Sequence, residues 1–230
     1  MSTPVAVAVG AAPVAAGLLV IATMRSVPLF DWLTRENSLL ESSQFVALVA
    51  ATLLLLSVGV HLIRRRRAAL GLAYLLLALG AFFTAGEEIS WGQTIFAWEG
   101  SDWLARSNYQ AETNLHTGVA HGPTVYGFIL IAAWGTLVPL VARGPSEPRT
   151  AVRYLLVPPL VLVPTFFVSF AYRVVRTALN PEERLPRYAL QIVEFAEFAE
   201  SCLYFAVLVI AILTWRLHFS GGARFRGAHA

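Results

Sequence analysis

Six stretches of about twenty apolar residues constrain what this chain can fold into. They cover residues 4–23, 39–63, 68–86, 123–142, 154–172 and 192–215. A helix of ~20 residues rises far enough to cross the hydrocarbon core of a bilayer. Because a spanning helix satisfies its own backbone hydrogen bonds in lipid, the pattern predicts an all-α fold. We expect a polytopic transmembrane helix bundle of about six spans, with residues 1–230 in a single domain.

The composition supports this interpretation. Of the 230 residues, 57% are hydrophobic and only 13% are charged, whereas soluble domains carry about 25% charged residues. The pI near 9.3 does not indicate nucleic acid, because the arginines stand at the ends of apolar runs. Cys202 is the only cysteine, which excludes an intrachain disulfide and a cysteine-based metal site. Membrane lipid is therefore the expected partner, and a second membrane protein is an alternative one.

The arginines predict the orientation of the bundle, because cytoplasmic loops are enriched in basic residues. The strongest such segment is the RRRR run at 64–67. If this loop is cytoplasmic, then the 143–153 loop and both termini are cytoplasmic too. The first apolar stretch lacks the basic start of a signal peptide, so we count it as a span. In the fifth stretch, Pro158, Pro159 and Pro164 predict a kink, because proline removes backbone donors.

Carboxylates gather at one level of the predicted bundle. In this orientation 13 of the 14 acidic residues lie on the outer side. Depth can be counted in residues from the arginine at the cytoplasmic end of each span. This count is 16 to 23 for the glutamates of the second, third and sixth spans, which are Glu41, Glu87, Glu88, Glu197 and Glu200. That corresponds to roughly 24 to 35 Å, near the outer edge of the hydrocarbon core. A glutamate at a helix end can simply reach into the headgroups, but Glu200 is deep enough to require a partner inside the bundle.

The start of the sixth span carries a glutamate at every third residue, at Glu194, Glu197 and Glu200. Residues at this spacing are neighbours on a helix, so their like charges repel. They are stable together if a cation lies between them, if arginines face them, or if some are protonated. Arg173 and Arg176, which end the fifth span, are the expected partners if no metal is bound.

The polar segment that follows the third span contains a second set of candidate ligands. Glu112 and His116 are four residues apart, so one helical turn would place both on one face. Carboxylate and imidazole together suit zinc, iron or manganese, although such a pair is more often only hydrogen-bonded. Before this segment, Trp91, Ile95 and Trp98 recur at helical spacing. We therefore expect residues 87–98 to continue the third span as an amphipathic surface helix, with Glu88 directed toward the protein.

These motifs resemble those of an uncharacterised family of bacterial multi-pass membrane proteins. The resemblance rests on GEEISWGQ at 86–93 and ETNLH at 112–116, with ENSLLES before them and EFAEFAES after them. It covers residues 31–122 and the sixth span. The resemblance implies a membrane protein whose polar motifs form one site, and it implies no particular activity.

Two functions are consistent with these residues. In the first, an outer-facing site binds a divalent metal and acts on a lipid or lipid-linked substrate. Glu88, Glu112, His116 and Glu197 would be the ligands, and Glu87 or Glu200 the general base. In the second, the protein is a non-catalytic membrane subunit or lipid-binding module held together by Glu/Arg pairs. A transport path is a weaker third option, because the inner halves of the spans lack carboxylates. The common depth of the glutamates also predicts that the carboxylates of the second, third and sixth spans meet the 108–116 segment in one pocket near the outer membrane boundary.

Overall fold

A computed structural model describes residues 3–35, 38–96, 98, 113–114, 121–142 and 150–219, and every regular element in them is helical. The longer helices are α1 (Thr3–Thr23), α3 (Leu39–Arg64), α4 (Ala68–Glu88), α7 (His121–Val141), α9 (Val163–Leu179) and α11 (Ala189–Phe219). The shorter ones are α2 (Val27–Thr34), α5 (Gln93–Phe96), α8 (Ala151–Leu156), α10 (Pro181–Arg184) and the 3-10 turns η1 (Ser90–Gly92), η2 (Leu160–Leu162) and η3 (Pro186–Tyr188). The all-α prediction is confirmed.

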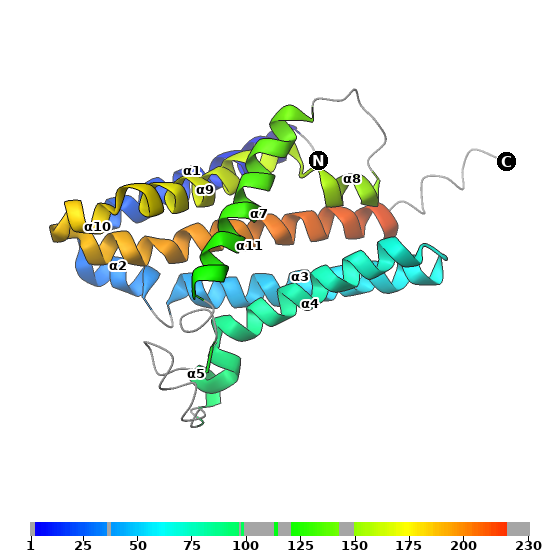
Figure 1. The fold of residues 1–230 in the computed structure, drawn as a ribbon, viewed down its shortest axis with the longest axis horizontal. Coiled ribbons are helices and arrows are strands. Elements are labelled where there is room, and N and C mark those ends of the chain that lie inside the picture. Colours follow the sequence, from blue (N-terminus) through cyan, green and yellow to red (C-terminus); the bar gives the residue numbers. More distant parts are fainter. Residues whose placement is uncertain are drawn as a thin grey trace.

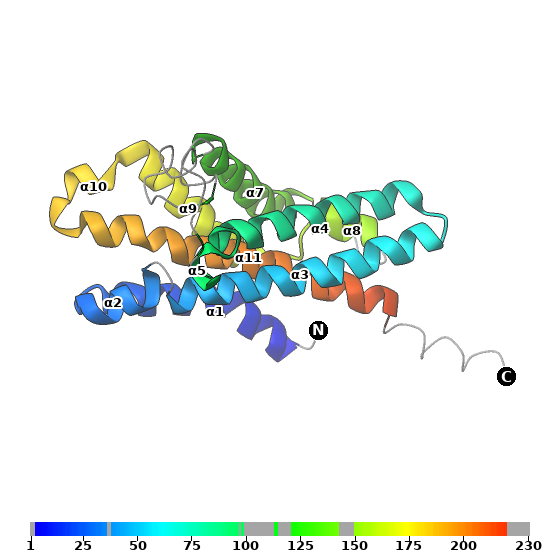
Figure 2. The ribbon, with the colours of Figure 1, turned by 90° about the horizontal axis from the view of Figure 1, so that it is seen from below.

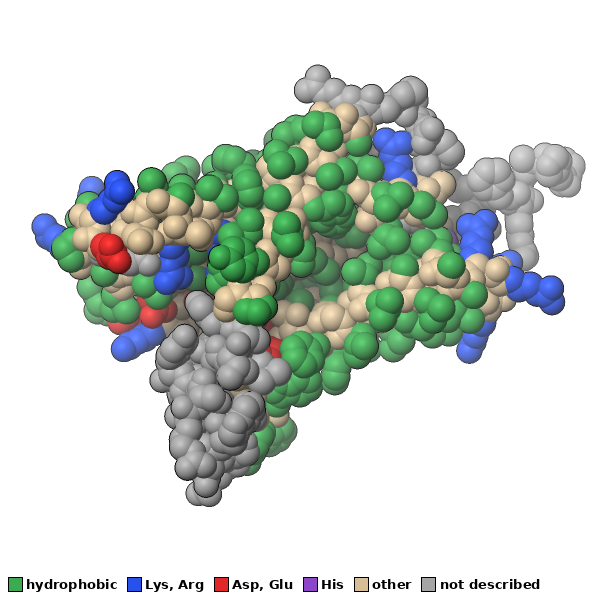
Figure 3. All heavy atoms as spheres, in the orientation of Figure 1, with side chains coloured by type: hydrophobic (Ala, Val, Ile, Leu, Met, Phe, Trp, Pro, Cys, Tyr) green, Lys and Arg blue, Asp and Glu red, His purple; other side chains and the backbone are tan. Residues whose placement is uncertain are grey.

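Six helical segments of the described residues are long and apolar enough to cross a membrane. The predicted runs match α1, α3, α4, α7 and α11 to within four residues at each end. Apolar side chains cover the middle of the molecule, and charged side chains gather toward its two ends (Figure 3). The chain is therefore a multi-pass integral membrane protein.

The bundle is built around α11, which packs against α3 and α9. In Figure 1, α3, α4 and α11 run along the long axis, whereas α7 crosses it at a steep angle and packs on α9. Figure 2 shows the turn between α3 and α4 at one end and α2 and α10 at the other. We call the first of these ends the arginine end, after residues 64–67. The chain enters α1 and leaves α11 on the side of the arginine end (Figure 1).

Glycine allows α3 and α4 to approach closely. A Cβ atom on Gly71 would lie 2.9 Å from the backbone oxygen of Gly59, and one on Gly59 would lie 3.0 Å from that of Gly71. Either substitution would force the two helices apart. At the other end of the pair, Ser38 caps α3 by accepting a hydrogen bond from the backbone N–H of Glu41 at 3.3 Å. The close pairing brings the end of α4 beside the beginning of α3.

The fifth span is broken where the prolines predicted a kink. Helix α8 ends at Leu156, and the chain is not helical at Val157, Pro158 and Pro159. Helix α9 then begins with Pro164 in its first turn, where the missing N–H of proline costs nothing. The prediction is confirmed, and the interruption is a full break rather than a bend.

The chain turns sharply away from the axis of α4 directly after Glu88 (Figure 1). Ser90, Trp91 and Gly92 all have positive φ, at 45°, 55° and 91°. The Trp91 ring consequently folds back over α4 and covers Gly86, where a Cβ atom would lie 2.9 Å from the ring. The short helix α5 projects sideways from the bundle (Figure 1). The prediction of a continuous amphipathic helix over 87–98 is therefore wrong, because the left-handed residues end α4 at Glu88.

Candidate functional site

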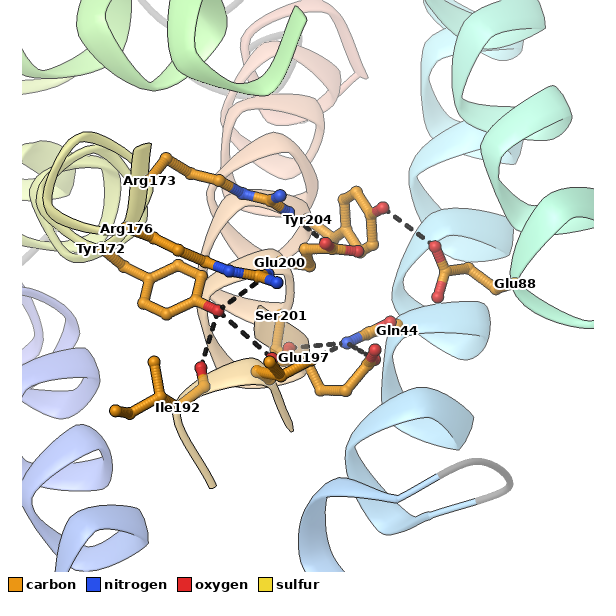
Figure 4. Close-up of polar contacts among 11 residues, drawn as sticks. Gln44, Glu88, Tyr172, Arg173, Arg176, Ile192, Glu197, Glu200, Ser201 and Tyr204 are labelled. Carbon is orange, nitrogen blue, oxygen red and sulfur yellow. Dashed lines mark hydrogen bonds and ion pairs between the residues drawn. The ribbon is translucent and has the colours of Figure 1, made fainter. Parts of the chain in front are cut away.

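A buried polar cluster lies between α3, α4, α9 and α11, toward the end of the bundle opposite the arginine end (Figure 4). Glu88, the last residue of α4, is only 8% exposed. Tyr204 of α11 donates a hydrogen bond from its hydroxyl to Glu88 Oε1 at 2.9 Å. This bond ties the end of α4 to the middle of α11. It also confirms the prediction that Glu88 points toward the protein.

Gln44 connects α3 to the glutamate stripe of α11. Its Nε2 donates to the backbone oxygen of Glu197 at 2.7 Å, to Glu197 Oε2 at 3.3 Å and to Ser201 Oγ at 2.9 Å. The carbonyl and the carboxylate can only accept, so they determine which end of the amide carries the nitrogen. The other amide atom, Gln44 Oε1, is buried and has no partner among the described residues.

An ion pair joins α9 to α11 within the same cluster. Arg173 Nη2 contacts Glu200 Oε1, and their side chains are 6% and 12% exposed. The guanidinium also lies over the ring of Phe128 on α7, with 4.8 Å between its Cζ and the ring centre. Arg173 therefore brings three helices together, because a cation stacks favourably on an aromatic face. This is one of the two pairings expected in the absence of a metal.

A second connection between α9 and α11 lies near the first turns of α11. The Tyr172 hydroxyl donates to the backbone oxygens of Ile192 and Val193 at 2.9 and 3.2 Å. Arg176 in turn donates from Nη1 to the Tyr172 hydroxyl at 3.4 Å. Arg176, the other predicted partner of the glutamates, thus acts through Tyr172 in this contact (Figure 4).

Carboxylates from three spans lie within range of one another. Glu88 lies close enough to Glu200, Glu197 and Glu41 for their charges to act on it. Glu197 is similarly within range of Glu200, Glu41 and Glu194. The predicted ligands Glu88 and Glu197 and the predicted base Glu200 therefore belong to one cluster. Each of these three has a donor from tyrosine, glutamine or arginine.

Glu87, the other predicted base, has different surroundings. It is 4% exposed and accepts a hydrogen bond from Trp91 Nε1 at 2.6 Å. The Trp91 ring makes edge contacts with Phe82 and Phe83 of α4. The turn after α4 thus brings the Trp91 indole against the Glu87 carboxylate.

The two motifs of the family resemblance contact each other. Asn114 Nδ2 donates to Ser90 Oγ at 3.1 Å, and the Thr113 backbone N–H donates to Gln93 Oε1 at 2.7 Å. Asn114 is only 3% exposed. Thr113 and Asn114 therefore contact the segment that follows Glu88. The predicted ligands Glu112 and His116 lie outside the described residues.

Metal ligation requires a set of convergent side chains that the described residues do not supply. Among them, no group of three or more His, Cys, Asp or Glu side chains is arranged to hold a metal ion. The described part of the cluster is instead organised by hydrogen bonds and one ion pair. The metal set of Glu88, Glu112, His116 and Glu197 remains a prediction.

An apolar groove of about 690 Å³ adjoins the cluster. It runs between α1, α3 and α11, and Thr165 of α9 forms part of its wall. Gln44 and Ser201 belong both to this wall and to the polar cluster. The groove and the cluster therefore share two adjoining side chains.

Tyr204 and Gln44 were not among the site residues predicted from the sequence. Tyr204 stands four residues after Glu200, so helical spacing placed it on the glutamate stripe. Its aromatic ring nevertheless resembled ordinary apolar packing. Gln44 lies in the second turn of α3, where a buried amide requires a polar partner. The need of a buried polar group for a partner could have indicated both residues as members of the site.

Comparison of the chain with protein-family models, with curated proteins and with solved structures finds no match.

Proposed function

We propose that the protein is a lipid-binding membrane module whose helices are held together by the buried polar cluster. The observation that carries this proposal is the sharing of Gln44 and Ser201 between the cluster and the apolar groove. A polar network in the wall of an apolar groove provides hydrogen bonds for the polar part of an amphiphile. The groove volume of about 690 Å³ is within the usual range for ligand pockets, about 300 to 1,000 Å³.

The contacts of the carboxylates support a binding module more than an open catalytic site. Glu200 is paired with Arg173, Glu88 accepts from Tyr204, and Glu197 accepts from Gln44. Polar groups inside a membrane bundle are costly unless they are partnered. Here the partners come from different helices, so satisfying the carboxylates also joins the helices.

Native mass spectrometry of the purified protein tests the proposal. We expect one lipid per chain to remain bound at collision energies that remove the detergent. Non-specific adducts produce a series of peaks whose intensity falls smoothly with the number of lipids. The peak for one bound lipid should be more intense than that series predicts. Retention of detergent alone, or of lipid only in that random distribution, would overturn the binding proposal.

A metal-dependent site is the second candidate, and the contact between Asn114 and Ser90 favours it. Glu112 and His116 each stand two residues from Asn114, and Ser90 stands two residues from Glu88. Glu88 and Glu197 would complete a ligand set for zinc, iron or manganese. Glu87 or Glu200 would then act as general base on a lipid or lipid-linked substrate.

Elemental analysis of the purified protein tests this second candidate. We expect about one metal ion per chain in the wild type, and its loss in Glu112→Ala and Glu197→Ala. Glu183→Ala, at an exposed residue of α10, is the matched control and should retain the metal. A wild-type protein without stoichiometric metal would remove this candidate and leave the binding module.

We also propose that the arginine end is cytoplasmic, with both termini on that side. Single cysteines can be placed at Arg65 and Glu183, two exposed positions at opposite ends of the bundle, in a Cys202→Ala background. In intact cells an impermeant maleimide should label the cysteine at 183 and not the one at 65. The reverse pattern would invert the orientation.

A further inference from the structure

The wall of the apolar groove is uncharged. Its sixteen lining residues include no Asp, Glu, Lys, Arg or His. Its polar groups are hydroxyls, one thiol and one amide, supplied by Ser42, Ser43, Gln44, Thr165, Ser201 and Cys202. Such a wall offers hydrogen bonds and no counter-charge.

Two residues of this wall have a buried polar atom that finds no partner among the described residues. Thr165 is fully buried, and its hydroxyl is its only polar side-chain group. Gln44 is 1% exposed, and its Oε1 is the unpartnered atom. Because its Nε2 is held by Glu197 and Ser201, Oε1 is an acceptor that requires a donor. Buried polar atoms in native proteins nearly always have a partner, which here would be a ligand or water.

We propose that the groove binds an uncharged membrane lipid with a free hydroxyl group, of the diacylglycerol or long-chain alcohol class. The inference rests on the lipid-binding function proposed above and names its ligand class. The lipid hydroxyl would donate to Gln44 Oε1, and the Thr165 hydroxyl would bond to a lipid oxygen. The hydrocarbon chain would lie against the apolar lining, which includes Ala16, Val46 and Leu208.

The charges near the groove disfavour a phosphate-bearing lipid. An ionised phosphate group carries negative charge and mainly accepts hydrogen bonds, so it is a poorer donor to Gln44 Oε1 than an uncharged hydroxyl. It would also lie near Glu197, whose carboxylate holds the Gln44 amide. Arg173 is already paired with Glu200, and Arg176 donates to the Tyr172 hydroxyl. An uncharged donor is the chemistry that the wall matches.

Photolabelling with two matched probes tests this inference in the full-length protein reconstituted in nanodiscs. The probes are a diazirine-labelled diacylglycerol and the phosphatidic acid with the same acyl chains, which replaces the hydroxyl by a phosphate. We expect the diacylglycerol to label groove residues of α1, α3 and α11 at least about fivefold more than the phosphatidic acid. A fivefold preference corresponds to about one hydrogen bond.

Three variants separate the groove from the rest of the lipid-facing surface. Thr165→Val removes only the hydroxyl and should lower diacylglycerol labelling about fivefold. Ala47→Trp fills the groove and should abolish labelling there, since Ala47 is part of its wall. Leu79→Trp places the same side chain on an α4 residue that is 61% exposed and outside the wall, so labelling should be unchanged.

Two outcomes would overturn the inference. Equal labelling by both probes, unchanged in Thr165→Val, would show ordinary lipid contact without recognition of a hydroxyl. Cross-links from the groove to a second copy of the chain would show that a protein helix covers it. If native mass spectrometry still finds one retained lipid, either outcome leaves the lipid-binding function in place and removes only the ligand class.

Discussion

Separate replacement of Arg173 and Glu200 should destabilise the protein much more than replacement of both. Their side chains are 6% and 12% exposed, so solvent screens neither charge effectively. Removing one partner of a buried ion pair typically costs about 3–5 kcal/mol, because the other charge is left uncompensated. We therefore expect Arg173→Met and Glu200→Met each to lower the free energy of unfolding by this amount. The free energy of unfolding of the double variant should be within about 2 kcal/mol of the wild-type value. This difference includes the loss of the cation–π contact between Arg173 and Phe128.

The measurement is equilibrium unfolding by SDS in mixed micelles, followed by circular dichroism. The pair of Arg35 and Asp31 on α2 is the control, because it has the same chemistry at 3.5 Å with side chains 67% and 23% exposed. Asp31→Asn should cost less than about 1 kcal/mol. Single losses of about 3 kcal/mol or more and a double loss of about 2 kcal/mol or less correspond to a coupling of at least about 4 kcal/mol, so additive effects of Arg173→Met and Glu200→Met would refute the prediction.

Two further predictions use the same assay. Tyr204→Phe should cost about 1–3 kcal/mol, because it removes a donor from buried Glu88, whereas Tyr126→Phe, at a residue 64% exposed, should stay within about 0.5 kcal/mol of wild type. Equal effects of these two variants would contradict a role for the Tyr204 hydroxyl. Gly86→Val should cost about 1–3 kcal/mol, because its side chain would collide with the tryptophan ring that covers α4. Gly80→Val on the same helix, with nothing within 4 Å of the new Cβ, should be close to neutral, and a comparable loss there would point to helix propensity instead.

The spans could be predicted from the sequence because the bilayer sets their length. Each apolar run must be long enough to cross the hydrocarbon core, and α3 begins and ends within one residue of its prediction. The depth of the glutamates in the membrane could be predicted in the same way, because a helix rises by a constant distance per residue and residue number therefore gives depth. The convergence of Glu88 with Glu197 and Glu200 was therefore accessible without coordinates.

The parts that sequence reasoning missed depend on contacts between distant segments. No local pattern places Ser90 and Trp91 at positive φ, a conformation that non-glycine residues rarely adopt. That turn is held by the Trp91 ring on α4, by its bond to Glu87, and by the hydrogen bond from Asn114, which lies 24 residues after Ser90 in the chain. The choice of Tyr204 as the donor to Glu88 likewise depends on how α11 and α4 pack, which periodicity within one helix does not determine.

The polar contacts between helices also have a consequence for biogenesis. Tyr204 follows Glu88 by 116 residues, and Glu197 follows Gln44 by 153. Translation proceeds at ~5–20 residues per second, so the ribosome needs roughly 6 to 30 s to complete these pairs. During this interval α3 carries the Gln44 amide and α4 carries the Glu88 carboxylate, and the partners of both have not yet been synthesised. Insertion of α11 is therefore the step that completes the bundle, and a nascent chain stopped before it should be recognised by membrane quality control.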